Sequence, residues 1–145
     1  MKFVFSQLHQ LHAPQEIVLR GTVVSNLESP ARAEALLTRL LADGHERLSP
    51  TGWDRRWIAA VHDLGYLDFL ETAFERWQSV PKASSLIHAH AFAHHSARTR
   101  PQSIQGQVGF YLSGGSCPVA EGTWQAAVGS AHTALEACKL VLDGA

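Results

Sequence analysis

The feature that most constrains the fold of this chain is an amphipathic run in its middle, residues 61–77, with the sequence VHDLGYLDFLETAFERW. Its apolar side chains follow the spacing of one helix face: Leu67, Leu70, Phe74 and Trp77. This pattern predicts a helix over residues 66–78, which Gly65 separates from a preceding helix over residues 53–62. Because an apolar helix face has to pack against another layer, the run predicts a folded, helix-rich domain.

Helix signals also occur nearer the two ends of the chain. Ser29 can cap the free N–H groups of a helix whose first residue is Pro30, and Gly44 can end this helix after about Asp43. The expected buried face of this helix consists of Leu36, Leu37, Leu40 and Leu41. A last helix should begin near Gly122 and bury a stripe made of Trp124, Ala127, Val128, Ala131, Leu135, Cys138 and Leu142.

Strand signals are sparse. Residues 2–6, KFVFS, are aromatic and β-branched and predict one short buried strand. Residues 9–28 have a mixed pattern, which indicates a long loop with at most a brief turn or strand. Residues 79–101 are expected to form a second long irregular stretch, and residues 106–115 a glycine-rich turn and loop.

Composition limits the class of protein. The 145 residues, 46% hydrophobic and 17% charged, are typical of one globular domain. A net charge of -1 gives no electrostatic reason to bind nucleic acid or an anionic membrane. The sequence shows neither a signal peptide nor an apolar stretch of membrane-spanning length, so we expect a cytoplasmic protein. Cys117 and Cys138 lack metal-binding spacing and are expected to be reduced core residues.

Four segments, taken in order, resemble one known family. They are ESPARAE at 28–34, the run at 61–77, IQGQVGFY at 104–111 and EGTW at 121–124. Their order and spacing resemble the N-terminal part of the histone deacetylases and acetylpolyamine amidohydrolases. The resemblance implies an α/β fold of the arginase–deacetylase type, with a mostly parallel sheet flanked by helices. Residues 1–145 would form a single N-terminal portion of that domain, supplying the helical flank, one clear strand and long loops.

The resemblance also implies zinc-dependent hydrolysis of acetylated amines, such as acetylpolyamines or acetyl-lysine. In this family two aspartates and a histidine hold the zinc ion, while a histidine pair moves protons and a tyrosine stabilises the oxyanion. We expect neither the Pro-Gly-His-His tetrad nor the Asp-x-His segment of the family in this chain. The pair His94-His95 precedes the glycine-rich turn, whereas the catalytic pair of the family follows the last helix. We therefore expect no catalytic residue, metal ligand or bound zinc here, and no activity of the chain alone.

The N-terminal part of these proteins supplies the rim of the substrate tunnel. The resemblance places rim positions at Gln105, at Ser116 and at Ile17, with Glu16 beside it. In polyamine-specific members these positions are acidic, and three carboxylates would attract a cationic polyamine. Because Gln105, Ser116 and Ile17 are uncharged, a less cationic acyl amide becomes a plausible substrate as well.

The histidines of the second irregular stretch are His88, His90, His94 and His95. This stretch resembles a family insertion that packs at a dimer interface and narrows the partner's tunnel, which predicts an interface or lid loop and a homodimer. Solvated side chains without a role and an adventitious metal site are the alternatives. For the whole chain, the alternative is a non-catalytic truncated relative that self-associates or binds a partner through exposed helix faces.

Overall fold

The amphipathic run forms α3, Leu64–Gln78, in the computed structural model, which describes residues 1–92 and 98–144. Asp63 caps this helix, because its carboxylate accepts a hydrogen bond of 3.0 Å from the backbone N–H of Tyr66. The buried side chains of the helix are Leu67, Phe69, Leu70, Ala73 and Trp77. All of them except Leu67 form one side of the main hydrophobic core.

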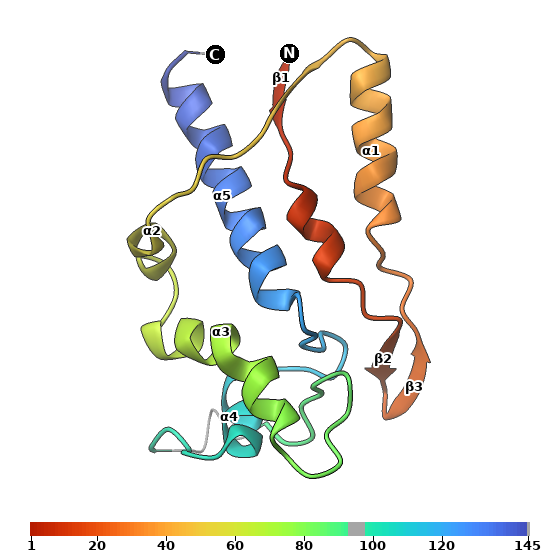
Figure 1. Cartoon of the computed structure of the whole chain (residues 1–145), viewed down its shortest axis with the longest axis vertical. Coiled ribbons are helices and arrows are strands. Elements are labelled where there is room, and N and C mark those ends of the chain that lie inside the picture. Colours follow the sequence, from red (N-terminus) through yellow and green to blue (C-terminus); the bar gives the residue numbers. More distant parts are fainter. Residues whose placement is uncertain (93–97, 145) are drawn as a thin grey trace.

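Helix α4, Ile104–Tyr111, and two irregular segments complete this core. Ile104 and Val108 of α4 are buried in it. The irregular segments meet at an isolated antiparallel bridge between Ile87 and Val119, with N–H···O distances of 2.9 and 3.0 Å. The core lies at the end of the elongated molecule that is opposite the two chain termini (Figure 1).

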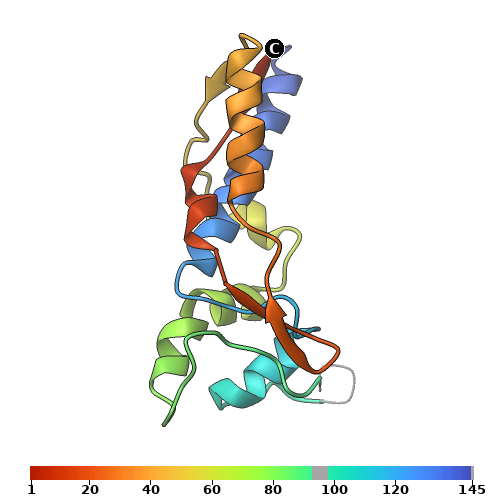
Figure 2. The same ribbon diagram turned by 90° about the vertical axis from the view of Figure 1, so that its right-hand side faces the viewer.

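The longest helix, α5, Thr123–Leu142, runs along the long axis of the molecule (Figures 1 and 2). The short 3-10 helix η1, Gln7–Leu11, packs against it. Two glycines permit this contact: a Cβ atom at Gly122 would lie 2.3 Å from the backbone oxygen of Leu11, and one at Gly129 would lie 2.9 Å from Cβ of Leu8. The two glycines are about two helical turns apart and therefore lie on the same side of the helix.

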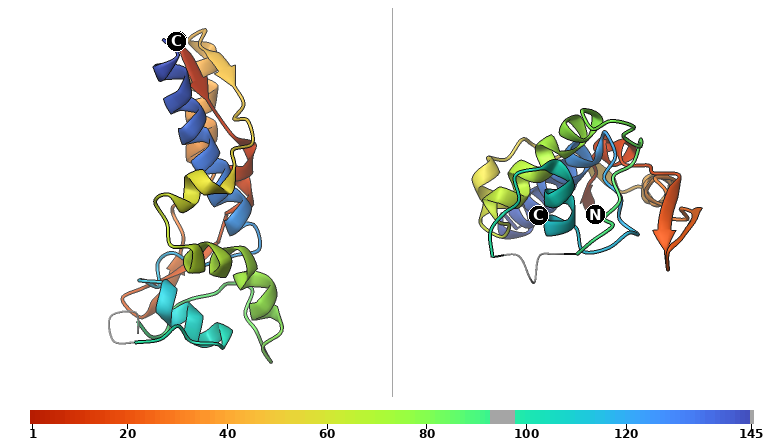
Figure 3. Two further views of the ribbon diagram at one scale, coloured as in Figure 1. Left: turned by 90° about the vertical axis from the view of Figure 1, so that its left-hand side faces the viewer. Right: turned by 90° about the horizontal axis from the view of Figure 1, so that it is seen from below.

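The strands form two small sheets within the described residues. β1, Lys2–Val4, pairs in parallel with β4, Glu46–Leu48. β2, Glu16–Leu19, pairs antiparallel with β3, Thr22–Ser25, and this hairpin stands at the core end of the molecule (Figures 1 and 3).

The turns and short helices follow local sequence rules. Arg20 and Gly21 have φ angles of 52° and 80°, the left-handed pair that a two-residue hairpin turn needs. Helix α1 spans Ala31–Ala42, and Gly44 follows it after the C-cap residue Asp43. The φ of Gly44 is 75°, a left-handed conformation that suits a residue without a Cβ atom. Helix α2, Arg55–Ala59, begins at Asp54, whose side chain accepts a hydrogen bond from the backbone N–H of Arg56.

The α/β class and the main predicted helices are confirmed, but several sequence-based expectations about local structure are wrong. Residues 104–111 form helix α4 rather than a glycine-rich turn, because Ser103 caps the N-terminus and the apolar residues bury against α3. The expected loop over residues 9–28 contains part of η1 and the β2–β3 hairpin. The first strand is only partly buried, since its pattern runs from exposed to half-buried.

The predicted helix faces are also less buried than expected. In α1 only Leu37 is buried, while Leu36 and Leu41 are exposed. In α5 the buried residues are Ala126 and Gly129, and the predicted stripe beside them is half-buried or exposed. The two cysteines are free, as expected, but both are exposed. Among the described residues, no helix is both long enough and apolar enough to cross a membrane.

Candidate functional site

The backbone carbonyl of Gly115 brings together three segments that are far apart in the sequence. It accepts a hydrogen bond of 3.2 Å from the N–H of Val18 on β2 and another of 3.2 Å from Nδ1–H of His88. A Cβ atom at Gly115 would lie 3.2 Å from Cβ of Val18, so a glycine lets the turn after α4 approach the hairpin closely. This contact positions the predicted rim residues beside it.

Two of the predicted rim positions flank this contact. Ile17 precedes Val18 on β2 and is half-buried, whereas Ser116 follows Gly115 and is exposed. Glu16 is exposed and precedes Ile17, so the alternation of a strand directs these two side chains to opposite faces of the hairpin. Ile17 and Ser116 thus lie beside the same contact, whereas Glu16 lies on the other face of the hairpin.

Gln105 lies elsewhere. It is exposed in the first turn of α4, and no hydrogen bond in the described part of the chain joins it to the turn around Ser116. Its neighbour Gln107 has a more evident structural role, because its side chain is only 4% exposed. Gln107 accepts a hydrogen bond of 2.7 Å from Arg76 and donates one of 2.8 Å to the carbonyl of Pro101.

The stretch predicted to be irregular, residues 79–101, is fixed near both of its ends, which lie in the described part of the chain. At its start, Nε1–H of Trp77 donates a hydrogen bond of 3.2 Å to the carbonyl of Ser84. Near its end, Arg100 lies 5.6 Å from the centroid of the Tyr111 ring, which in turn stacks on Phe69 at 5.0 Å. Burial raises the pKa of the Tyr111 phenol, and the positive charge of Arg100 opposes this rise.

The predicted interface histidines lie in different surroundings. His88 is half-buried and holds the Gly115 carbonyl, so it has a structural contact that sequence reasoning did not identify. His90 is exposed. His94 and His95 lie outside the described residues, and their predicted role in an interface or lid stays a prediction.

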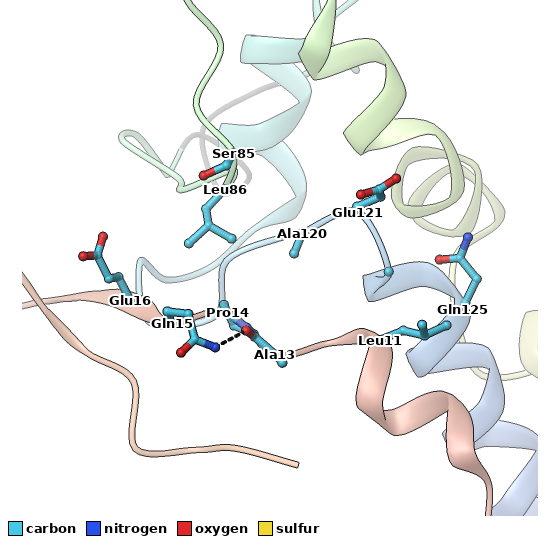
Figure 4. Close-up of a pocket in the computed structure, with 11 residues that line it drawn as sticks. Leu11, Ala13, Pro14, Gln15, Glu16, Ser85, Leu86, Ala120, Glu121 and Gln125 are labelled. Atoms are coloured by element: carbon cyan, nitrogen blue, oxygen red, sulfur yellow. Dashed lines mark hydrogen bonds between the residues drawn. The ribbon is translucent and has the colours of Figure 1, made fainter. Parts of the chain in front are cut away.

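A pocket of about 590 Å³ lies beside the hairpin, between η1, the segment around Leu86 and the start of α5 (Figure 4). Two carboxylates, those of Glu16 and Glu121, lie on opposite sides of it. Its remaining lining is uncharged and mostly small or apolar: Leu11, Ala13, Pro14, Gln15, Ser85, Leu86, Ala120, Gly122 and Gln125. Sequence reasoning missed this pocket, because its lining comes from three segments that only the fold brings together.

Next to this pocket, His12 contacts the first turn of α5. Its Nδ1 lies 2.8 Å from Oγ1 of Thr123, and the same oxygen accepts a hydrogen bond of 2.8 Å from the N–H of Ala120. Burial lowers the pKa of His12 from its ordinary value of 6.5. The neutral ring is thus favoured, and its unprotonated Nδ1 can accept the proton of the Thr123 hydroxyl.

The residues that the structure describes do not fit a zinc centre. Over residues 1–92 and 98–144, no group of three His, Cys, Asp or Glu side chains is arranged to hold a metal ion. The expectation that the sequence lacks an Asp-x-His segment is wrong, because Asp43, Gly44 and His45 have this spacing. In the structure these residues end α1, and the Asp43 carboxylate accepts a hydrogen bond of 2.9 Å from Nε of Arg39.

No protein-family model matches the chain. The chain is 30% identical to an acetylpolyamine amidohydrolase of Mycoplana ramosa over 145 residues, which cover 99% of this chain and 42% of that protein. It is 38% identical to an acetylpolyamine amidohydrolase of Burkholderia pseudomallei (strain 1710b) over 138 residues, 93% of this chain and 39% of that protein.

A solved structure is similar over the entire chain. The crystal structure of acetylpolyamine aminohydrolase from Burkholderia pseudomallei matches with a TM-score of 0.93 and 36% sequence identity. The match covers 100% of this chain and 42% of that chain. This chain therefore spans about two fifths of the length of the relatives that it matches.

Proposed function

This chain belongs to the acetylpolyamine amidohydrolase family, and we propose that it forms the N-terminal part of a deacetylase-like enzyme that hydrolyses the amide bond of an acetylated amine. The observation that carries the proposal is the structural match over the whole chain, with a TM-score of 0.93 at 36% identity. Such similarity along 145 residues supports a shared architecture, including the segments that form the rim.

In this proposal the chain binds and orients substrate at the tunnel rim. Ile17 and Ser116 flank the Gly115 carbonyl, and the hairpin and the turn are held in register by that single acceptor. The rim positions Ile17, Ser116 and Gln105 carry no charge, so they discriminate weakly between a cationic acetylpolyamine and a neutral acyl amide. Acetylated polyamines and acetyl-lysine are the substrate class that we propose.

Zinc belongs to the proposal only as the cofactor of the assembled enzyme. The described residues offer no fitting group of ligands, so its ligands and the catalytic side chains would come from a part of the enzyme outside this chain. We assign no catalytic step to the residues of this chain. We also propose a cytoplasmic homodimer, in which the stretch with His88 and His90 contributes to the interface or lid.

The second candidate is a non-catalytic module that self-associates or binds a partner. Exposed apolar side chains favour it: on and after α2, Trp57 is 47% exposed and Val61 79% exposed, and Leu64 at the start of α3 is 60% exposed. Surfaces of this kind mark association sites. They are equally consistent with helices that pack against the remainder of a larger domain.

A complementation experiment separates the two candidates. The chain is co-expressed with the part of the Burkholderia pseudomallei relative that it does not match, and release of acetate from an acetylated polyamine is measured with and without a chelator. We expect chelator-sensitive hydrolysis from the pair and none from either part alone. The matching part of that relative serves as the positive control.

Two results would contradict the proposal. Metal-dependent hydrolysis by this chain alone would show that it contains its own catalytic centre. A stable complex or homodimer that stays inactive, while the positive control is active, would support the non-catalytic module instead.

A further inference from the structure

We propose that the pocket between η1, Leu86 and the start of α5 binds a linear aliphatic amine with an ammonium group at each end, at a site separate from the tunnel rim. The choice of a polyamine rests on the proposed function, because the relatives act on acetylated polyamines by name. The preference for an elongated dication rests on the pocket itself.

The charge that the described residues give the pocket is negative. Among its lining residues in 1–92 and 98–144, Glu16 and Glu121 are charged, and none is a lysine, arginine or histidine. Neither carboxylate forms an ion pair with a basic side chain in residues 1–92 and 98–144. Two carboxylates without a basic partner at the edge of a pocket attract cations and disfavour anions.

The shape of the pocket fits a chain of methylene groups between two charges. Figure 4 shows Glu16 and Glu121 on opposite sides, with Leu86 and Ala120 between them and Pro14 below. An apolar middle with acidic ends matches an alkyl chain that carries terminal ammonium groups. The volume of about 590 Å³ lies within the range of small-molecule sites.

The walls of the pocket are fixed by contacts that cross the fold. Asn26 holds the first wall, because its side chain donates a hydrogen bond of 2.9 Å to the carbonyl of Pro14 and its N–H donates one of 2.8 Å to that of Gln15. The Ile87–Val119 bridge joins the other two walls. A preformed site loses less conformational entropy on binding than a mobile one does.

The pocket and the rim share strand β2 but use opposite faces of it. Glu16 lines the pocket, and the next residue, Ile17, is the candidate rim residue. An amine in the pocket would therefore not occupy the rim. It would lie against the same strand that the Gly115 carbonyl holds in place.

The test is a titration of the full chain with 1,8-diaminooctane, followed by two-dimensional ¹H–¹⁵N NMR. We expect saturable shift changes at the backbone amides of Gln15, Glu16, Leu86 and Glu121. The uncharged analogue 1,8-octanediol, of similar length, should cause no saturable change there. Raising the NaCl concentration should weaken the binding of 1,8-diaminooctane, because salt screens exposed charges.

Variants assign the binding to the two carboxylates. Glu16→Gln and Glu121→Gln should each weaken the affinity by about two- to fivefold, the range expected for one exposed ion pair. Gln125→Lys, which places an ammonium group in the pocket, should weaken it at least as much. Glu46→Gln, at an exposed position on β4 outside the pocket lining, is the matched control and should leave the affinity unchanged.

The proposal is overturned if 1,8-diaminooctane causes no saturable change, or if the changes are confined to Ile17, Val18, Gly115 and Ser116. Equal affinity in the wild-type chain, Glu121→Gln and Gln125→Lys would also overturn it. None of these outcomes depends on hydrolysis. Failure of the amine-binding proposal can therefore be distinguished from failure of the complementation experiment.

Discussion

His12 and Thr123 lie 111 positions apart in the sequence and are joined by a contact of 2.8 Å between Nδ1 and Oγ1. The same threonine oxygen accepts the N–H of Ala120, so one hydroxyl ties the end of η1, the start of α5 and the segment before α5. The contact lies beside the pocket that Glu16 and Glu121 flank. The His12–Thr123 contact therefore joins two of the segments that line the pocket.

We predict that His12 makes the chain less stable in mildly acidic solution. Burial lowers its pKa below 6.5 in the folded state, so the unfolded chain binds the proton more readily. Above pH 6.5 both states are neutral at this residue and there is no penalty. Stability is lost as the pH falls from 6.5 through the lowered pKa. Denaturant midpoints measured between pH 8 and pH 5 should show this loss.

The variant His12→Asn keeps an acceptor near the position of Nδ1 but cannot titrate. It should show a smaller loss of stability over the same pH range than the wild-type chain. His90→Asn is the control, since His90 is exposed and has no described contact of this kind. Parallel pH profiles for the wild-type chain and His12→Asn would contradict the prediction.

A second prediction concerns Glu136 on α5, whose hydrogen bonds join this helix to the segment before α2. Its carboxylate accepts hydrogen bonds from the hydroxyl and the N–H of Thr51 and from Nε1–H of Trp53. The hydrogen bond from the Thr51 hydroxyl is the largest cause of its lowered pKa. A lowered carboxyl pKa contributes stability above the ordinary value of 4.5, and this is lost as the pH falls through the folded-state pKa.

Glu136→Gln should therefore lower the urea midpoint at pH 7, and its difference from the wild-type chain should shrink below pH 4.5. Glu75→Gln, at an exposed position on α3, is the control. If the urea midpoints of the wild-type chain and Glu136→Gln differ equally at pH 7 and at pH 3.5, the charge of Glu136 does not strengthen its hydrogen bonds to Thr51 and Trp53.

The sequence predicted those elements whose signals are local. Helix α3 could be placed because its apolar residues repeat with helical spacing, and Gly44 marked the end of α1. Helix α4 was missed because Gly106 and Gly109 suggested a turn. In the structure Gly109 instead permits close packing, since a Cβ atom there would lie 2.7 Å from the carbonyl of Ala91.

The candidate site was only partly predictable for the same reason. The resemblance to a family directed attention to Ile17 and Ser116, which the fold does bring near each other. The His88–Gly115 hydrogen bond and the pocket between Glu16 and Glu121 depend on long-range contacts. No local pattern in the sequence encodes such contacts, so they become visible only when the segments are placed in space.

A third prediction tests the contact between η1 and α5. Gly122→Ala should destabilise the chain by about 1–3 kcal/mol, the usual cost of overpacking, because the new Cβ atom would press on the backbone of Leu11. Gly52→Ala is the matched control, since no atom lies within 4 Å of its added Cβ. Thermal unfolding followed by circular dichroism measures both. An unchanged midpoint in Gly122→Ala would show that η1 can move away without cost.

A fourth prediction concerns the buried amide of Gln107. Gln107→Leu removes the acceptor of the Arg76 hydrogen bond and the donor to the Pro101 carbonyl. It should lower the free energy of unfolding by about 1.5–3 kcal/mol. Gln105→Leu, in the exposed first turn of the same helix, should change stability little. Denaturant unfolding compares the two. Equal effects would mean that the hydrogen bonds of Gln107 do not hold the end of the irregular stretch.

The last prediction tests whether the turn at Ser116 belongs to the rim of the complemented enzyme. Ser116 is exposed and follows Gly115, whose carbonyl is held by Val18 and His88, so a new carboxylate at this position would have a fixed location. Ser116→Asp should lower KM for a cationic acetylpolyamine by about two- to fivefold, the range of one exposed ion pair. It should leave KM for an uncharged N-alkylacetamide unchanged, because that substrate gains no charge interaction.

Ser116→Asn is the matched control, as it has the size of aspartate without the charge. A decrease in KM that is equal for both substrates, or equal in Ser116→Asn, would mean that the residue acts through shape or stability. No change for the cationic substrate would place Ser116 outside the rim.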